Sequence, residues 1–246
     1  MTDEIQKTAI VTGASRGIGA AIAERLARDG LAVVINYAGS ATAAETLAAA
    51  VQQLGGKAMA VQADVSDPAA MRRLFDTAEA AYGGVDVIVN NAGIMELAPI
   101  AETSDDLFDR TIAINLKGVF NSMREAAKRL RAGGRVISLS SSVVGLYQPN
   151  YAVYAATKGA IEAMTHVVAK ELRGRDITVN AIAPGPTGTD LFLKGKSQAL
   201  IDELANLSPL QRLGTPQDIA AAVSWLAGPG GSWINAQIIR VNGGVI

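Results

Sequence analysis

Short apolar runs rich in β-branched residues alternate along the chain with longer alanine-rich segments whose apolar positions recur at helical spacing. The runs predict strands at residues 8–11, 32–35, 58–61, 85–89, 135–139, 178–182 and 238–241. The segments between them predict helices near 18–29, 41–54, 69–82, 105–131, 154–173 and 217–227. Strands that are apolar on both faces and alternate with helices indicate a parallel sheet covered on both sides. We therefore predict one doubly wound α/β domain over residues 1–246 with a seven-stranded parallel sheet.

Several of these helices carry start signals. Asp67-Pro68 and Thr215-Pro216 place a cap residue before a first-turn proline, and Ser104 precedes two aspartates that suit a helix N-terminus. One connection stands out by its length, because residues 187–210 separate a strand from the next helix without a strong pattern of their own. Such an excursion is typical of a lid over a binding site.

Composition excludes several classes of protein. Among 246 residues, 22 Lys and Arg balance 23 Asp and Glu for a net charge of −1, which argues against a nucleic-acid or anionic-membrane partner. The absence of cysteine and the single histidine exclude disulfides, thiolate zinc sites and multi-histidine sites, so we expect no metal. The polar N-terminus has no signal-peptide core, and the uncharged stretches 136–157 and 219–239 are broken by polar residues or by Gly and Pro. We expect a cytoplasmic protein that does not enter a membrane.

A glycine-rich turn, Thr12-Gly13-Ala14-Ser15-Arg16-Gly17-Ile18-Gly19, joins the first predicted strand to a helix. Gly13 and Gly17 permit a tight turn and a close approach of the backbone to a ligand, and Gly19 permits close packing of the helix on the strand. The helix N-terminus then offers free N–H groups to a pyrophosphate. This context indicates a dinucleotide-binding domain of the Rossmann type, with a purely structural turn as the alternative.

The same turn contains G-x-S-x-G, the nucleophile elbow of serine hydrolases. A hydrolase requires a histidine base, and only His166 is present, about 18 Å beyond Tyr154 along the same predicted helix. A catalytic histidine normally lies on a loop beyond a strand. The hydrolase interpretation is therefore disfavoured.

Polar and glycine-containing motifs follow the carboxyl ends of the predicted strands, which meet at the ligand crevice of a doubly wound sheet. Read in order, they are Thr12-Gly13-x-x-x-Gly17-x-Gly19, Asn90-Asn91-Ala92-Gly93, Asn115, the serines at 140–142, Tyr154-x-x-x-Lys158 and Pro184-Gly185. This ordered set covers essentially the whole chain. It resembles the short-chain dehydrogenases/reductases, and it is most similar to 3-oxoacyl-[acyl-carrier-protein] reductases and related ketoreductases.

The resemblance implies hydride transfer from a nicotinamide to a carbonyl carbon. In that mechanism Tyr154 protonates the carbonyl oxygen, Ser141 polarises it, and Lys158 also bonds the nicotinamide ribose. Asn115 resembles the residue that holds a water linking Lys158 to solvent, and a kink-forming asparagine is the alternative. The family resemblance also implies a homotetramer.

The residues themselves support the central pair. Tyr154 and Lys158 are four apart on a predicted helix, so their side chains share a face. Because a nearby ammonium favours the phenolate, we predict that Lys158 lowers the pKa of Tyr154 from about 10. Tyr151 lacks such a partner, since its i+4 residue is Ala155.

The position of the catalytic serine is less constrained. The family spacing of 13 residues before the tyrosine points to Ser141, as does counting along the strand from Arg135. The small-residue tail Val143-Val144-Gly145, however, follows Ser142, which remains the alternative.

The cofactor preference follows from a missing acid. An NAD site needs a carboxylate at the end of the second strand, whereas residues 35–40 contain none. Arg16 could pair with a 2′-phosphate, with Asn36 and Ser40 adding hydrogen bonds, so we predict NADPH over NADH. The positions expected to line the nucleotide are Gly13, Ser15, Arg16, Gly17, Ile18, Gly19, Asn36, Ser40, Asp64, Val65, Asn91, Ala92, Gly93, Tyr154, Lys158, Pro184, Gly185, Thr187 and Thr189.

The expected substrate walls are residues 95–97, 143–151 and 187–207, which are mostly apolar and suit an uncharged or weakly polar ketone. Four arginines (Arg129, Arg131, Arg173 and Arg175) could meet an acidic acyl carrier protein, or could simply be solvated at helix ends.

Ala236 stands where the family commonly has glycine. We expect this change to alter the local backbone geometry or the packing between subunits. A dehydrogenase working in the oxidative direction has the same residues and remains open. A non-catalytic dinucleotide sensor would not need Tyr154 or Lys158.

Overall fold

Seven parallel strands form the centre of the computed structural model, which describes residues 6–246. Their order is β3-β2-β1-β4-β5-β6-β7, and every neighbouring pair is parallel. The order reverses between β1 and β4, which is where a doubly wound sheet opens its ligand crevice. The strands are β1 (Thr8–Val11), β2 (Ala32–Tyr37), β3 (Ala58–Gln62), β4 (Val85–Asn90), β5 (Leu130–Leu139), β6 (Thr178–Pro184) and β7 (Ile238–Val241). The predicted seven-stranded α/β fold is confirmed.

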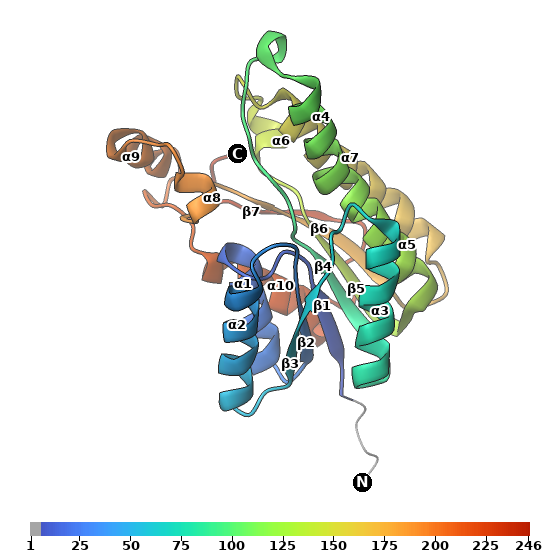
Figure 1. Ribbon diagram of the computed structural model, residues 1–246. Helices are drawn as coiled ribbons and strands as arrows, with labels where there is room; N and C mark the ends of the chain where they lie inside the picture. The colour runs from blue at the N-terminus through green and yellow to red at the C-terminus, as the bar shows by residue number, and fades with distance from the viewer. Residues whose placement is uncertain (1–5) are drawn as a thin grey trace.

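Helices cover both faces of the sheet (Figure 1). One face packs against α1 (Gly17–Arg28), α2 (Ala41–Gln53) and α10 (Pro216–Ala227). The other packs against α3 (Pro68–Tyr82), α5 (Gly118–Arg129) and α7 (Ala152–Glu171). Alternate residues of a strand point to opposite faces, so Ala9 and Val11 join the first core and Ile10 joins the second. This is why the strands are apolar at nearly every position.

The predicted long helix 105–131 is wrong as a single element. It is divided into α4 (Asp105–Thr111), a π-helical segment η2 (Ile112–Lys117) and α5, and Leu130 already belongs to β5. Within η2, Asn115 is fully buried, and its side chain binds both the N–H and the carbonyl of Ile94 at 2.8 Å. That tertiary contact accompanies the local unwinding. Gly133, at φ 78°, accommodates the backbone that extends β5 toward its start.

The predicted caps are confirmed. Asp67 accepts hydrogen bonds from the N–H groups of Ala69 and Ala70, and Ser104 accepts one from Leu107. Thr215 and Asp218 cap α10 reciprocally.

The excursion between β6 and α10 carries two short helices, α8 (Asp190–Leu193) and α9 (Gln198–Asn206). Its base is closed by the N–H of Gly188 to the carbonyl of Gly214 and by the N–H of Gly214 to the carbonyl of Pro186, both at 2.9 Å. Farther along, the hydroxyl of Ser208 donates to the carbonyl of Gly243 at 2.7 Å. The excursion therefore has a firmly held base.

Three further short helices are η1 (Ile100–Glu102), α6 (Val143–Leu146) and η3 (Pro229–Gly231). Within residues 6–246, no helix has the length and apolar character needed to cross a membrane.

Candidate active site

Side chains at the carboxyl ends of β1 and β4 join these strands into one unit. The hydroxyl oxygen of Thr12 accepts from the N–H of Asn91 at 3.0 Å and of Ala92 at 3.1 Å. In return, the amide of Asn91 donates to the carbonyls of Thr12 and Gly13 at 2.9 and 3.0 Å. Asn91 thus holds the glycine turn in place, while Ala92 and Gly93 continue from it along the crevice.

The glycine turn is as tight as the sequence predicts. Gly13 has φ 60°, and a Cβ there would lie 2.8 Å from the Cα of Ala92. A Cβ on Gly19 would lie 2.4 Å from Nδ2 of Asn91. Gly17 has φ 58°, and the nearest neighbour of a Cβ there would be the Thr189 methyl at 3.6 Å. The turn therefore packs closely on one side and faces the excursion on the other.

The N-terminus of α1 fits an anionic ligand. Arg16 occupies its N-cap position with no side-chain cap, and the first turn holds no acidic residue. Side chains do cap α3, α4, α9 and α10. The first N–H groups of a helix need partners, so those of Gly17, Ile18 and Gly19 are available to a pyrophosphate beside Ser15. The residues present fit a dinucleotide.

Asn36 is buried and hydrogen-bonded within the protein. It is only 1% exposed; its Oδ1 accepts from the N–H of Gly13 at 3.2 Å, and its Nδ2 donates to the carbonyls of Val61 and Ala63 at 3.3 and 2.9 Å. Its amide supports the glycine turn from behind, and its contact with a 2′-phosphate stays a prediction. Arg16 and Ser40 are exposed, and neither side chain has a hydrogen-bond or ion-pair partner within residues 6–246.

The remaining predicted nucleotide positions lie at the same edge of the sheet. Asp64 is exposed and binds Ser66 through one carboxylate oxygen, whereas Val65 is buried against Gly118. Pro184 ends β6 and Gly185 follows it. The hydroxyl of Thr187 donates to the carbonyl of Gly185, and that of Thr189 caps α8. Thr187 and Thr189 thus form the start of the excursion.

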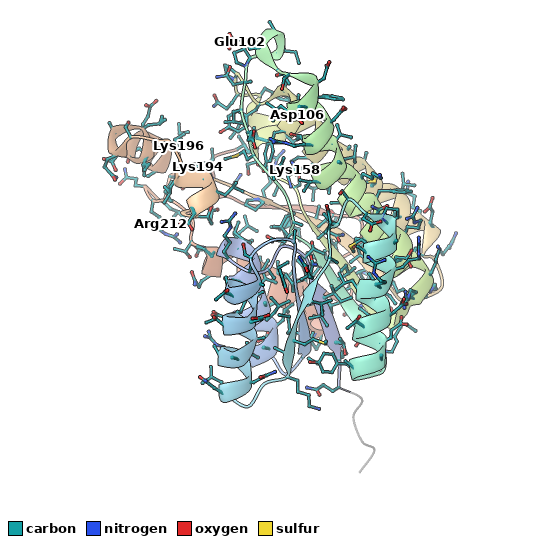
Figure 2. All side chains as sticks on the ribbon, in the orientation of Figure 1. Glu102, Asp106, Lys158, Lys194, Lys196 and Arg212 are labelled. Carbon is teal, nitrogen blue, oxygen red and sulfur yellow. The ribbon has the colours of Figure 1, made fainter. Side chains whose placement is uncertain are left out.

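Tyr154 and Lys158 lie on one face of α7, as predicted. The Lys158 ammonium nitrogen is 5.5 Å from the centroid of the Tyr154 ring. Lys158 is 5% exposed, and its Nζ donates to the carbonyl of Leu139 at 2.7 Å. Tyr151 meets Tyr154 edge to face, with ring centroids 6.2 Å apart. In Figure 2, Lys158 lies inside the molecule, whereas Lys194 and Lys196 lie out on the excursion.

The prediction that the Tyr154 pKa is lowered is wrong: the protein itself, without a bound cofactor, raises this pKa. Burial raises the pKa of Tyr154 to about 12; Ser141 acts in the opposite direction, and Tyr151 adds to the rise. Burial also lowers the pKa of Lys158 to about 8. Desolvation penalises the charged form of each group, and it is the largest cause of both shifts.

The three consecutive serines differ in what their hydroxyls bind. Ser140 donates to Glu162 at 2.7 Å, and Ser142 donates to the carbonyl of Ala183 at 3.2 Å while accepting from Asn242 at 3.0 Å. Both are buried. Ser141 is half-buried; its hydroxyl oxygen accepts from the N–H of Val143 at 3.3 Å, and its side chain lowers the pKa of the Tyr154 phenol. Sequence reasoning missed Glu162 and Asn242, because nothing in their local pattern shows that they meet these serines.

Three of the four arginines considered for carrier docking have internal partners. Arg129 binds Glu79 and Asp76 at 2.6 Å, which raises its pKa. Arg131 pairs with Asp86, and Arg175 donates to the carbonyl of Leu130 at 2.5 Å. These contacts lie near the amino ends of β4 and β5. Docking of a carrier protein by these arginines stays a prediction.

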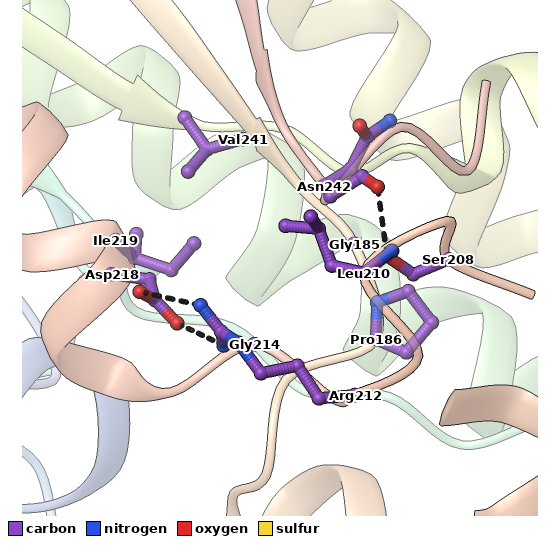
Figure 3. A pocket seen from close by; sticks show the side chains of 11 residues that line it. Gly185, Pro186, Ser208, Leu210, Arg212, Gly214, Asp218, Ile219, Val241 and Asn242 are labelled. Carbon is purple, nitrogen blue, oxygen red and sulfur yellow. Dashed lines mark hydrogen bonds and ion pairs between the residues drawn. The ribbon is translucent and has the colours of Figure 1, made fainter. Parts of the chain in front are cut away.

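A cavity of about 150 Å³ lies behind the strand ends, between the base of the excursion and β7 (Figure 3). The ion pair between Arg212 and Asp218 forms part of its wall, with Nη1 and Oδ2 2.7 Å apart. Ser141, Tyr154 and Lys158 are not among its lining residues. It is separate from these three residues, although Gly185, one of the predicted nucleotide positions, also lines it.

Known proteins resemble this chain over nearly its whole length. A family model described as enoyl-(acyl carrier protein) reductase matches residues 13–246. A short-chain type dehydrogenase/reductase of Picea abies is 45% identical over 250 residues, which cover 98% of this chain and 92% of the relative. A chloroplastic NADPH-dependent aldehyde reductase-like protein of Arabidopsis thaliana is 44% identical over 254 residues, with 98% and 94% covered.

A solved structure is similar to this chain in both fold and sequence. The short-chain dehydrogenase of Burkholderia cenocepacia in complex with NADP has a TM-score of 0.93 and 39% identity, with 99% of each chain covered.

Proposed function

This chain belongs to the short-chain dehydrogenase/reductase family, and we propose that it is an NADPH-dependent ketoreductase that reduces a ketone or a 3-oxoacyl carbonyl to a secondary alcohol. The observation that carries the proposal is the convergence of Ser141, Tyr154 and Lys158. Of the three consecutive serines, Ser141 is the one whose side chain lowers the pKa of the Tyr154 phenol, whereas the hydroxyls of Ser140 and Ser142 donate to Glu162 and to the carbonyl of Ala183. We therefore assign the catalytic serine to Ser141.

NADP(H) is the cofactor, in line with the NADPH-dependent relative and the NADP-bound structure. The glycine turn and the α1 N-terminus would hold its pyrophosphate, and Arg16 and Ser40 its 2′-phosphate. Asp64 and Val65 would flank the adenine. The remaining part of the nucleotide would be lined by residues 91–93, 184–185 and 187–189. Lys158 would bind the nicotinamide ribose. When bound, NADPH supplies the hydride.

The protein groups supply the proton and its placement. With a pKa of about 12, Tyr154 holds its proton at Oη at neutral pH and can donate it to a carbonyl oxygen. The Ser141 hydroxyl would donate a hydrogen bond to the same oxygen. The Lys158 ammonium would stabilise the phenolate that remains. In the oxidative alternative the same phenol would act in its ionised form as the base.

The proposal is tested by NADPH consumption with a panel of ketones, β-ketoesters and acyl thioesters. We expect Tyr154→Phe to lose at least about a hundredfold in kcat, as removal of a general acid does, while nucleotide binding persists. Ser141→Ala should lose activity comparably, and Ser142→Ala should mainly lower Tm. Full turnover in Tyr154→Phe would overturn the proposal.

Arg16 provides the test of cofactor preference. We expect Arg16→Ala to raise the KM for NADPH by about 10–100-fold, the loss of a charge-assisted bond of about 1.5–3 kcal/mol. The KM for NADH should change little. Arg28→Ala, an exposed arginine on the same helix, serves as the control. An unchanged KM for NADPH in Arg16→Ala would refute the assignment.

The acyl-carrier partner, the homotetramer and the cytoplasmic location stay predictions. The relative from Arabidopsis is named chloroplastic, so similarity by itself does not assign a compartment.

A further inference from the structure

Three residues on one face of α7 meet three consecutive residues where β5 ends. Lys158 binds the carbonyl of Leu139, and Tyr154 interacts with Ser141. The residue between them, Ser140, is bound by Glu162. Tyr154, Lys158 and Glu162 are spaced four apart, so they lie along one face of the helix. The proposed mechanism uses the first two and leaves Glu162 without a role.

The contact of Glu162 with Ser140 is short and sheltered. The Ser140 hydroxyl donates to Oε1 of Glu162 at 2.7 Å, and Ser140 is 3% exposed. A hydrogen bond to an ionised carboxylate is about twice as strong as one between neutral groups. The N–H of Ser140 also donates to the carbonyl of Ile182 at 2.7 Å. Ser140 is thus fixed from the neighbouring strand and from α7.

Ser142 is fixed on the other side of Ser141. Its N–H donates to the carbonyl of Pro184 at 2.9 Å, and its hydroxyl binds Ala183 and Asn242. Ser141 therefore lies between two anchored residues. Of the two anchors, only Ser140 is tied to the helix that carries Tyr154 and Lys158.

We propose that Glu162 is a positioning residue, which acts through Ser140 to hold the Ser141 hydroxyl in register with the Tyr154 phenol. The inference rests on the proposed function, because it assigns Glu162 to the same reaction. Reaction rates are sensitive to such placement, since a displacement of about 1 Å can cost about a hundredfold. This role needs no contact between Glu162 and the substrate or cofactor.

The test is the reduction of ethyl acetoacetate by NADPH, together with crystal structures of the variants. We expect Glu162→Ala to lower kcat by about 10–100-fold, with the KM for NADPH within about twofold of wild type. Glu162→Gln should restore most of kcat, because its amide oxygen still accepts from Ser140. Glu171→Ala, an exposed glutamate at the end of α7, is the matched control and should behave as wild type.

Ser140→Ala removes the other partner of the same hydrogen bond and covers the case in which Glu162→Ala fails to fold. We expect it to lower kcat similarly, and the double variant to be no slower than the slower single variant, because both remove one interaction. In the crystal structure of either variant, Ser141 Oγ should be displaced from its wild-type position.

Wild-type kcat, or an unmoved Ser141, in both Glu162→Ala and Ser140→Ala would overturn the inference. So would a Glu162→Gln variant as slow as Glu162→Ala. If Tyr154→Phe is inactive in the same assay, such results leave the proposed function standing. Turnover in Tyr154→Phe would instead overturn the proposed function, and this inference with it.

Discussion

At the scale of one residue, the burial of Lys158 in the site lowers the stability of the fold at neutral pH. Burial lowers its pKa to about 8, whereas an unfolded lysine keeps the usual value of 10.5. Between these two pH values the unfolded chain binds a proton that the native chain does not. The contribution of Lys158 therefore makes the fold more stable as pH rises through this window.

The variant Lys158→Met removes this dependence. We expect its free energy of unfolding, relative to wild type, to fall by about 3 kcal/mol between pH 7 and pH 10.5, at 1.36 kcal/mol per pKa unit. Urea denaturation at the two pH values measures the difference. Lys170→Met, on an exposed residue of α7, should show a pH-independent difference. The same flat behaviour in Lys158→Met would contradict the burial argument.

Ala236 is a second residue whose conformation has a measurable cost. Its φ is 57°, in the left-handed region that costs a non-glycine residue about 1–2 kcal/mol. The family pattern commonly has glycine here, and glycine adopts this φ without that cost.

We expect Ala236→Gly to raise the free energy of unfolding by about 0.5–1 kcal/mol, because relief of strain exceeds the added entropy of the unfolded chain. Thermal denaturation should show a Tm higher by about 2–4 °C per kcal/mol. Ala221→Gly, at an exposed position within α10, should instead lower Tm. A lower Tm in Ala236→Gly would refute the strain argument.

At the scale of elements, hydrophobic periodicity predicted the strands and helices that are determined by residues close to one another in the sequence. It could not predict η2, because a π-helical turn has nearly the same apolar spacing as an α-helix. Its position depends on Asn115 binding Ile94, which is 21 residues away. For the same reason the sequence did not show that β5 begins at Leu130, where Leu130 pairs with Val85 of β4 and Arg131 binds Asp86.

The parts of the site that follow from residue spacing along a helix, or from the direction of the strands, were predictable from the sequence. Tyr154 and Lys158 share a face because they are four apart, and the strand ends meet because the sheet is parallel. Burial was not predictable. It made Asn36 a support for the glycine turn, and it reversed the direction of the Tyr154 pKa shift.

At the scale of the whole molecule, the excursion after β6 connects the nucleotide site with the solvent. Thr189 lies beside Gly17, while Lys194 is exposed farther along and Lys196 follows it. A nucleotide held at the glycine turn would also contact the start of the excursion and restrict its opening.

We expect saturating NADP⁺ to slow tryptic cleavage after Lys194 and Lys196 by at least about tenfold, since ligand at a hundred times its Kd adds about 2.7 kcal/mol to the bound form. Mass spectrometry of the fragments follows each site. Cleavage after Arg173, in the exposed turn between α7 and β6, should not change. Equal rates at Lys194 with and without NADP⁺ would exclude a lid that closes over the nucleotide.

The ion pairs of Arg129 and Arg131 lie near the amino ends of β4 and β5, far along the strands from the serines at the carboxyl end of β5. Laboratory evolution of this chain can therefore be divided spatially. Libraries confined to residues 95–97, 143–151 and 187–207 would diversify substrate preference, while the ion pairs at the opposite rim stay unchanged.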